Sequence, residues 1–321
     1  MDSLGHLRQL VALAETGNFR KAGQKLGISH SAVSQTIKRL EGEYGTELFD
    51  RTRFDGSRNE TVPTALGERI VAAARIAINE MEAAARDVQM LRDLEAGQLL
   101  IGTDPAVSES LLAPAMVRLI NSHPSWRFKV IICNRNEWER YLEERQIDIY
   151  IGLRPDRESD TFRYRELELV PPVVLCSADH PLVGQGPISI ETLKTYSVIG
   201  GDVPDWFLWG IMEAYPETFP DISTLRDTFL TSQGLGLLRQ LLLLSNAVAT
   251  LPEFIVKNEI EAGKVCKLDI IGWPYKKRTI PGVAAWLNQR PVPPAAHQLL
   301  THIQMVLRYG VSEFRKEAGL P

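Results

Sequence analysis

The sequence contains very little cysteine. Cys133, Cys176 and Cys266 are the only three among 321 residues. They are odd in number and far apart, and no CxxC or cysteine–histidine spacing connects them, so neither a disulfide framework nor a zinc site is indicated. We expect three reduced cysteines with at least one in the core, and we predict no metal and no cofactor.

Long apolar runs are also missing. The N-terminus lacks the hydrophobic stretch of a signal peptide. The most apolar later stretch, residues 235–251, is interrupted by Arg239, Gln240 and Asn246, which argues against a membrane span. These absences predict a cytoplasmic protein. The composition is otherwise ordinary, and a chain of this length favours two or three domains.

Acidic residues are absent from one basic stretch near the N-terminus. Between residues 16 and 40 the chain carries no Asp or Glu, and its five cations are Arg20, Lys21, Lys25, Lys38 and Arg39. The net charge is +1 for residues 1–60 and −5 for the rest, although the whole chain carries −4. A summed charge hides such a distribution, so we expect the two parts to face different partners.

Helical periodicity in the same stretch predicts a helix-turn-helix. Apolar residues recur at helical spacing over residues 4–14 and again over 19–26. A tight turn at 27–29 follows, and Ser29 is a good N-cap for a third helix. The inner face of that helix carries Val33, Ile37 and Leu40. Two short helices joined by a brief turn that contains glycine are typical of this motif.

The outer face of the third helix carries side chains suited to reading DNA. Opposite the apolar stripe lie Ser31, Ser34, Gln35 and Lys38. Serine hydroxyls and glutamine amides can bond base edges in a major groove, and lysine can reach guanine or a phosphate. Phosphate contacts are expected from Arg20, Lys21, Lys25 and Arg39. The alternative is a small helical bundle with a solvated polar face.

Residues 17–51, GNFRKAGQKLGISHSAVSQTIKRLEGEYGTELFDR, resemble the N-terminal domain of LysR-type transcriptional regulators. The matching pieces form an ordered series that includes Gly17-x-Phe19, Leu26-Gly27, Ala32-Val33-Ser34, Leu40-Glu41 and Leu48-Phe49-x-Arg51. Pro63-Thr64-x-x-Gly67 resembles the close of the family's wing. The resemblance implies a winged helix-turn-helix whose third helix enters the major groove.

Two departures from the family pattern bear on the DNA contacts. His30-Ser31 stands where the family commonly has Gln-Pro, and residues 53–60 look longer than the usual wing. For His30, a base contact, a phosphate contact and a solvent-facing helix start all stay open. The expected DNA-binding residues are Arg20, Lys21, Ser29, His30, Ser31, Ser34, Gln35, Lys38, Arg39, Arg51 and Arg53.

A long helix is predicted from Thr64 to about Leu94. Its apolar residues step by three or four positions, close to a heptad seam. They are Leu66, Ile70, Ala74, Ala77, Met81, Ala84, Val88 and Leu91. Such a helix has no core of its own, so it packs either on its own domain or on a second copy. The family resemblance implies an antiparallel pair, and the charged residues 92–97 read as a hinge.

The remaining residues alternate between strand and helix patterns, which predicts parallel sheets covered by helices. Strands are predicted at 98–102, 127–133, 148–152, 173–177, 197–199, 247–250 and 283–287. A loop is expected at 103–108, and helices at 136–146 and 295–307. Asp148–Gly152, His180-Pro181-Leu182 and Gly234-x-Gly236 resemble landmarks of the LysR effector domain, which implies a fold similar to periplasmic binding proteins.

The fold class we expect is an all-α-rich winged helix-turn-helix plus long linker helix, followed by an α/β periplasmic-binding-protein-like effector domain of two subdomains. The DNA-binding domain takes residues 1–62, the linker or dimerisation helix 63–95, and the effector domain 96–321. Within the effector domain, subdomain I takes 96–166 and 272–321, and subdomain II takes 167–271.

Ligands in such folds bind at the carboxyl ends of strands and near helix N-termini. The expected effector is a small molecule, with an organic acid as the leading class. Its expected contacts are Thr103, Asp104, Ser108, Arg135, Asn136, Arg154, Asp202, Trp206, Thr231 and Ser232. A surface role for Arg154 and core packing for Trp206 are the alternatives. Asp104 would repel an anion unless it is protonated or paired.

No catalytic signature appears: the sequence has no GxSxG, Walker or HExxH motif, so we expect no enzyme. The leading prediction is a LysR-type transcriptional regulator whose promoter binding or activation is modulated by the effector. We expect a homodimer or homotetramer that contacts RNA polymerase. An enzyme tethered to DNA and an effector-free architectural DNA binder are the alternatives. Turnover of a substrate would favour the first, and DNA binding unchanged by any small molecule the second.

Overall fold

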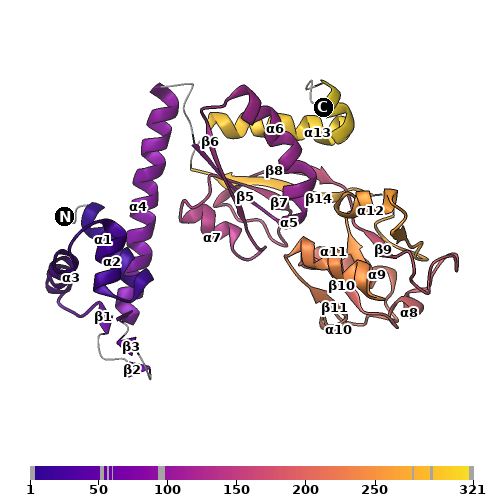
Figure 1. Ribbon diagram of the computed structural model, residues 1–321, viewed down its shortest axis with the longest axis horizontal. Helices are drawn as coiled ribbons and strands as arrows, with labels where there is room; N and C mark the ends of the chain where they lie inside the picture. The colour runs from indigo at the N-terminus through magenta and orange to yellow at the C-terminus, as the bar shows by residue number, and fades with distance from the viewer. Residues whose placement is uncertain are drawn as a thin grey trace. The chain divides into compact units, whose positions relative to one another are not determined.

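The computed structural model describes residues 4–50, 54–55, 58–59, 61–92, 98–276, 278–289 and 292–317. Arg51, Arg53 and most of the expected hinge lie outside the described residues. The chain forms two compact units, the first built almost entirely from residues up to Leu91 and the second from those that follow (Figure 1). Among the described residues, no helix has the length and apolarity that a membrane crossing requires.

Three helices begin the first unit: α1 (Leu4–Thr16), α2 (Phe19–Leu26) and α3 (His30–Tyr44). Side chains cap the second and third, because Asn18 accepts the N–H of Arg20 at 2.9 Å and Ser29 accepts that of Ala32 at 3.2 Å. Gly27 ends α2 in the left-handed conformation, with φ of 69°. The predicted helix-turn-helix, with Ser29 as its cap, is therefore confirmed.

Two short antiparallel pairs follow the helices. β1 (Phe49–Asp50) pairs with β4 (Val62–Pro63), and β2 (Phe54–Asp55) pairs with β3 (Arg58–Asn59), which forms the hairpin of a wing. The Glu41 carboxylate of α3 accepts the N–H of Leu48 at 3.1 Å, so α3 holds the start of this segment.

The long helix α4 (Ala65–Arg92) has 28 residues and is about 42 Å long. One part of the predicted seam, Ala74, packs with Val71 in the core of the first unit. Other residues of the predicted seam are exposed to solvent: Leu66 is 43 % exposed, Met81 59 % and Val88 49 %. The helix therefore packs on its own unit along one stripe and leaves a second apolar stripe open.

The second unit contains two five-stranded sheets. The first has the order β6-β5-β7-β14-β8 and the second β11-β10-β12-β9-β13. The strands of the first sheet are β5 (Gln98–Thr103), β6 (Arg127–Ile132), β7 (Ile149–Leu153), β8 (Phe162–Leu169) and β14 (Ile280–Leu287). Those of the second are β9 (Val173–Ser177), β10 (Val198–Gly200), β11 (Phe229–Thr231), β12 (Val248–Leu251) and β13 (Val265–Lys267).

Both sheets are mixed, so the prediction of parallel sheets is wrong in part. β5 runs parallel to β6 and β7, and β10 runs parallel to β11 and β12. β14 is antiparallel to β7 and β8, and β9 is antiparallel to β12 and β13. The chain passes from one sheet to the other after β8 and returns at β14. β8 runs on to Leu169 opposite Ile280, so the first passage lies beyond the predicted boundary at residue 166.

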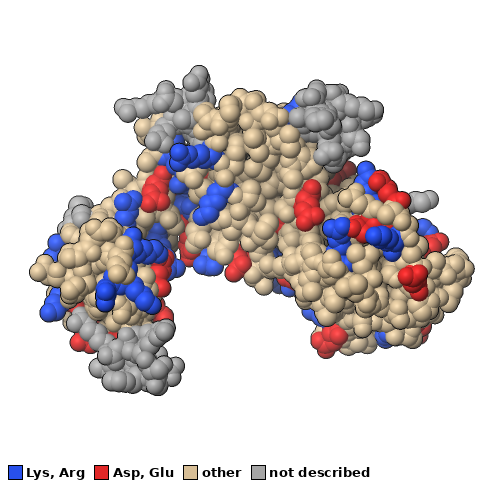
Figure 2. Space-filling model, in the orientation of Figure 1, with Lys and Arg blue, Asp and Glu red and all other residues tan. Residues whose placement is uncertain are grey.

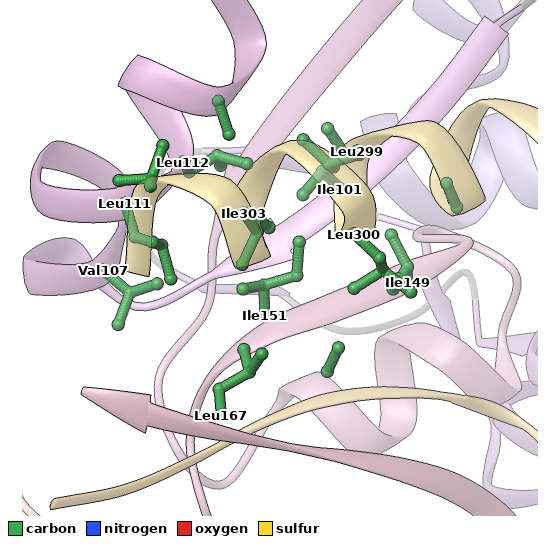
Figure 3. Close-up of a cluster of buried hydrophobic side chains, with 14 of the residues drawn as sticks. Ile101, Val107, Leu111, Leu112, Ile149, Ile151, Leu167, Leu299, Leu300 and Ile303 are labelled. Atoms are coloured by element: carbon green, nitrogen blue, oxygen red, sulfur yellow. The ribbon is translucent and has the colours of Figure 1, made fainter. Parts of the chain in front are cut away.

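Helices cover both sheets. They are α5 (Pro105–Val107), a π-helical turn (Ser108–Leu112), α6 (Ala113–Ser122), α7 (Trp138–Glu143), α8 (Ile190–Leu193), α9 (Asp205–Ala214), α10 (Ile222–Asp227), α11 (Leu235–Leu244), a 3₁₀ turn (Glu253–Val256), α12 (Lys257–Glu261) and α13 (Pro294–Glu317). Figure 3 shows α13 crossing the first sheet, with Leu299 and Ile303 of the helix near Ile101 and Ile151 of the strands. The expected α/β domain of two subdomains is confirmed.

Two glycines allow close approach of the backbone in the first unit. A Cβ on Gly23 would lie 2.8 Å from the carbonyl oxygen of Ile28, and one on Gly67 would lie 1.9 Å from that of Leu48. Gly67 is the last residue of the quoted Thr64-x-x-Gly67 motif, and its N–H donates to the Thr64 hydroxyl at 3.0 Å. The motif therefore fixes the start of α4 against β1.

We expect Gly67→Ala to destabilise the first unit by about 1–3 kcal/mol, because its methyl group would overlap the Leu48 carbonyl. Gly42→Ala is the matched control, since that helical glycine has open space around it. It should add about 0.5–1 kcal/mol of stability. Denaturation of the full chain, followed by circular dichroism, measures both. Equal effects of the two substitutions would contradict the close packing.

Candidate functional site

The side chains of α3 divide into a buried and an exposed face. Val33, Ile37 and Leu40 are almost fully buried. Ser31, Gln35 and Lys38 are exposed, whereas Ser34 is half-buried. At the start of the helix, the exposed hydroxyls of Ser29 and Ser31 lie 2.9 Å apart and share a hydrogen bond. The structure thus exposes three of the four predicted base-reading side chains to solvent.

Only some of the cations that were predicted to contact phosphates lack an ion pair with another described residue. Lys25 pairs with Glu15 at 2.6 Å, and Arg39 pairs with Glu43 at 3.3 Å. Arg20, Lys21 and Lys38 are exposed and form no ion pair with any residue that the structure describes. Figure 2 shows several Lys and Arg side chains over the helices of the first unit. Acids just outside the acid-free stretch therefore partly neutralise it.

The second unit contains a cavity of about 150 Å³. It lies between the two sheets, beyond the carboxyl ends of β5, β7, β10 and β12. Seven of the ten expected effector contacts line it: Asp104, Arg135, Asn136, Arg154, Asp202, Trp206 and Ser232. Strand ends from both sheets meet here, as the rule for α/β folds requires.

The other three expected contacts do not line the cavity. Thr103 is fully buried in β5, and Thr231 is exposed on β11. Ser108 lies inside a helix, where its hydroxyl donates to the Pro105 carbonyl at 2.6 Å. The predicted loop at 103–108 is wrong, because Asp104 caps a helix that starts directly after β5.

Asp104 holds two backbone segments together at the edge of the cavity. One carboxylate oxygen accepts the N–H of Val107 at 2.9 Å, and the other accepts that of Leu153 at 2.9 Å. Burial raises the pKa of Asp104 above its ordinary value, while these backbone N–H groups act to lower it. A carboxylate is thus kept in a poorly hydrated position.

Tyr150 is the main cavity residue that the sequence did not reveal. Its side chain is 2 % exposed and stacks on Trp138 with ring centroids 4.7 Å apart. Tyr150 lines the cavity, and its hydroxyl has no hydrogen-bond partner among the described residues. The only signal was a tyrosine in an otherwise aliphatic strand, two residues before Gly152. Burial raises the pKa of Tyr150 well above its usual range, so the phenol stays protonated.

An ion network spans the two subdomains beside the cavity. The Arg135 guanidinium lies 3.1 Å from Asp156, 3.4 Å from Asp202 and 3.3 Å from Asp205. Arg135 and Asp156 belong to subdomain I, and the other two acids to subdomain II. Asp205 also pairs with Arg226.

Trp206 joins the same two subdomains. Its indole N–H donates to the Arg154 carbonyl at 2.9 Å, and its backbone N–H donates to Asp156 at 3.1 Å. The Arg154 guanidinium forms ion pairs with two other acids, Glu158 at 2.9 Å and Glu166 at 3.3 Å. Trp206 is therefore a bridge between subdomains as well as a wall of the cavity.

His180 of the quoted His-Pro-Leu motif has a structural role. Its Nδ1 accepts the N–H of Leu182 at 3.1 Å, so the proton is on Nε2, which donates to the Asn246 carbonyl at 3.2 Å. This buried imidazole ties the loop after β9 to the segment before β12.

The cysteines are free thiols, and Cys133 and Cys176 are buried as expected. Cys133 lines the cavity, and burial raises its pKa to about 11, so it is not a nucleophile near neutral pH. Within the part of the chain that the structure describes, no cluster of three or more His, Cys, Asp or Glu side chains could hold a metal ion.

We expect Arg135→Met to lower the free energy of unfolding of the second unit by about 1–2 kcal/mol, between the values for surface and buried ion pairs. Three carboxylates would then face one another without their shared cation. Lys257→Met is the control, because it removes only an exposed pair with Glu261 and should change stability by about 0.5 kcal/mol or less. Calorimetry of the full chain measures both. Identical melting of the two variants would show that the network adds no stability.

Comparison with known proteins gives two family matches. The family described as "Bacterial regulatory helix-turn-helix protein, lysR family" matches residues 4–68. The family described as "LysR substrate binding domain" matches residues 92–308, which is more than half of the chain. The two matches fall on the first and second structural units.

Full-length relatives share both parts. The SDS degradation transcriptional activation protein of Pseudomonas sp. (strain ATCC 19151) is 26 % identical over 302 residues, covering 93 % of this chain and 94 % of its own. CrgA of Neisseria meningitidis serogroup C is described as an HTH-type transcriptional regulator and is 28 % identical over 264 residues, covering 82 % and 83 %.

Solved structures show the same fold at lower identity. A full-length variant of OxyR from Pseudomonas aeruginosa has a TM-score of 0.64 and 23 % identity, covering 96 % of this chain and 97 % of its own. CbnR in complex with its target DNA has a TM-score of 0.67 and 13 % identity, covering 95 % and 99 %. With both of its units matched in this way, the chain belongs to the LysR family of transcriptional regulators.

Proposed function

We propose that this regulator reads its promoter with α3 and is modulated by a small molecule held in the cavity between the two sheets. The observation that carries the proposal is the cavity itself. It gathers side chains from strand ends of both subdomains, and the network around Arg135 and Trp206 joins those subdomains. A ligand there contacts both halves of the unit at once.

The exposed face of α3 supplies the base contacts in this proposal. Ser31, Gln35 and Lys38 face solvent, and Arg20 and Lys21 add cations near the start of α2. A neighbour of similar fold, CbnR, has been solved in complex with its target DNA, which supports DNA binding by this fold. The further expected DNA contacts are Ser29, His30, Ser34, Arg39, Arg51 and Arg53.

Modulation requires that the ligand favour one arrangement of the subdomains over another. A ligand in the cavity contacts side chains next to the bonds that join the subdomains, so it can shift their relative angle. The changed angle would alter the presentation of paired α3 helices to DNA and the contact with RNA polymerase. Acting on promoter DNA, the protein would work in the cytoplasm of a bacterial cell.

We infer that the chain works as a homo-oligomer paired through α4. Leu66, Met81 and Val88 lie on one side of that helix and are 43–59 % exposed, which is costly for an isolated helix in water. A second copy would bury this stripe, as the heptad-like spacing favours. The pairing also fixes the spacing between two reading helices.

Two further interpretations compete with effector modulation. A catalytic role for the second unit would be revealed by turnover of a substrate. An effector-free binder would show the same operator footprint whatever small molecule is added. An organic acid stays the effector class predicted from the sequence.

We expect Gln35→Ala to lose discrimination between operator variants by about 1–3 kcal/mol if the amide bonds a base bidentately. Lys38→Ala should weaken binding to all sequences alike and reduce the salt slope by about one. Titration of fluorescent operator and scrambled DNA at several salt concentrations measures both effects. Gln304→Ala, at an exposed position of α13 in the second unit, is the control. Full specificity in Gln35→Ala would remove that residue from the reading face.

We expect Met81→Asp to weaken self-association by about 2–4 kcal/mol, because each dimer would lose two partly buried methionines and gain two charges. Ala72→Asp places the same charge on the opposite, exposed side of α4 and should leave association nearly unchanged. Sedimentation velocity of the full chain over a concentration series measures both. Equal dissociation in the two variants would place the interface elsewhere.

A further inference from the structure

Both arginines that line the cavity form ion pairs with protein carboxylates. Five charged side chains line it: Asp104, Arg135, Arg154, Asp156 and Asp202, with a net charge of −1. Arg135 is already shared by three carboxylates, and Arg154 by two. No lysine or histidine occurs among the described residues that line the cavity. An anion that bound a guanidinium would compete with these protein carboxylates, even though the Nε atom of Arg135 has no hydrogen-bond partner among the described residues.

The walls of the cavity are mainly apolar. Side chains from both subdomains contribute, among them Val107, Leu153, Val203, Phe207, Leu235 and Phe254. An apolar cavity of about 150 Å³ is large enough to bind benzene. The space therefore suits a ligand with a compact apolar body.

The polar end of the cavity lies where Tyr150 meets Asp104. The point at which a Cβ of Gly152 would stand is 2.2 Å from the Tyr150 hydroxyl and 2.7 Å from the Oδ2 atom of Asp104. The two oxygens therefore approach each other beside Gly152, where no side chain separates them. The Tyr150 hydroxyl, on a side chain that is only 2 % exposed, has no partner among the described residues. A hydroxyl beside a cavity that has no protein partner can form a hydrogen bond with a ligand or water there.

We propose that the effector has an apolar body and a head that donates a hydrogen bond, a hydroxyl or an amine but not a carboxylate, and that this head binds between Tyr150 and Asp104. Each Asp104 oxygen accepts one backbone N–H and keeps a second lone pair for a donor on the ligand. The Tyr150 hydroxyl can donate to a ligand oxygen in the same place. This inference rests on the proposed role of the cavity.

A carboxylate head is disfavoured in the same position. It would bring a second negative charge next to Asp104 in a poorly hydrated space, where like charges repel strongly. Burial is the largest cause of the raised pKa of Asp104, which reflects the same shortage of water. A hydroxyl or an ammonium group meets no such repulsion.

Three probes that share one apolar body test the inference: 2-phenylethanol, phenethylamine and phenylacetate. Dissociation constants are measured by calorimetry on the full chain. At about 0.5 kcal/mol of binding free energy per non-hydrogen atom, ligands of this size bind in the millimolar range or somewhat below. We expect the alcohol or the amine to bind at least about tenfold more tightly than phenylacetate. Equal or tighter binding of phenylacetate overturns the inference, and so does the absence of binding by all three up to about 10 mM.

Two variants test the position of the head. Tyr150→Phe keeps the ring on Trp138 and should weaken the alcohol several-fold while leaving phenylacetate unchanged. Asp104→Asn should weaken the amine most and strengthen phenylacetate, because it removes the opposing charge. Tyr141→Phe, outside the cavity, is the control. Unchanged affinities in Tyr150→Phe, or no change in the order of the probes in Asp104→Asn, would contradict the placement.

Operator binding by the same preparations separates this inference from the proposed function. A protein that binds its operator specifically and prefers phenylacetate remains a ligand-responsive regulator with a different effector class. A protein whose footprint ignores every bound probe loses the proposed modulation, whichever head group the cavity prefers.

Discussion

The sharing of the Arg135 guanidinium among three carboxylates is the constraint on which the second unit depends. Asp156 comes from the same subdomain, whereas Asp202 and Asp205 come from the other. One cation therefore orients the loop after β6, the loop after β7 and the start of α9. It also shapes the character of the cavity, because a guanidinium surrounded by acids has much of its charge balanced within the protein. The same few charged residues join the two subdomains and line the cavity.

Local chemistry explains why the first unit could be predicted closely. Ser29, Gly27 and the apolar residues of α3 act within one or two turns of their own position, so their spacing in the sequence already contains the geometry. The caps and the buried stripe agree with that expectation. Lys25 shows where such reasoning ends. Its partner Glu15 lies on another helix, and only the packing of α1 on α2 brings the two charges together.

The cavity could be predicted only in part, for reasons that individual residues make clear. Strand ends meet at one edge of a sheet, so Asp104, Arg154 and Asp202 were within reach of the sequence. Ser108 was misplaced because Asp104 caps a helix at once and turns that hydroxyl back onto its own backbone. Tyr150 was missed because its importance lies in a missing partner, and the absence of a hydrogen bond is a property of the packed structure alone.

The position of Asp104 suggests how a ligand at one end of the cavity could act on the bonds that join the subdomains. Its carboxylate accepts the N–H of Leu153, and the carbonyl of the next residue, Arg154, accepts the indole N–H of Trp206 from the other subdomain. A ligand that bonds to Asp104 therefore competes with the Leu153 N–H for its carboxylate. Leu153 is separated from Trp206 by only one residue and one further hydrogen bond. Such a chain transmits a signal only if the subdomains have two arrangements that the ligand distinguishes. The bond from the Trp206 indole to the Arg154 carbonyl is neutral, whereas the bond from its backbone N–H to Asp156 and the nearby ion network involve charged groups. The indole bond is therefore the weaker tie and the one that a small ligand has enough free energy to change.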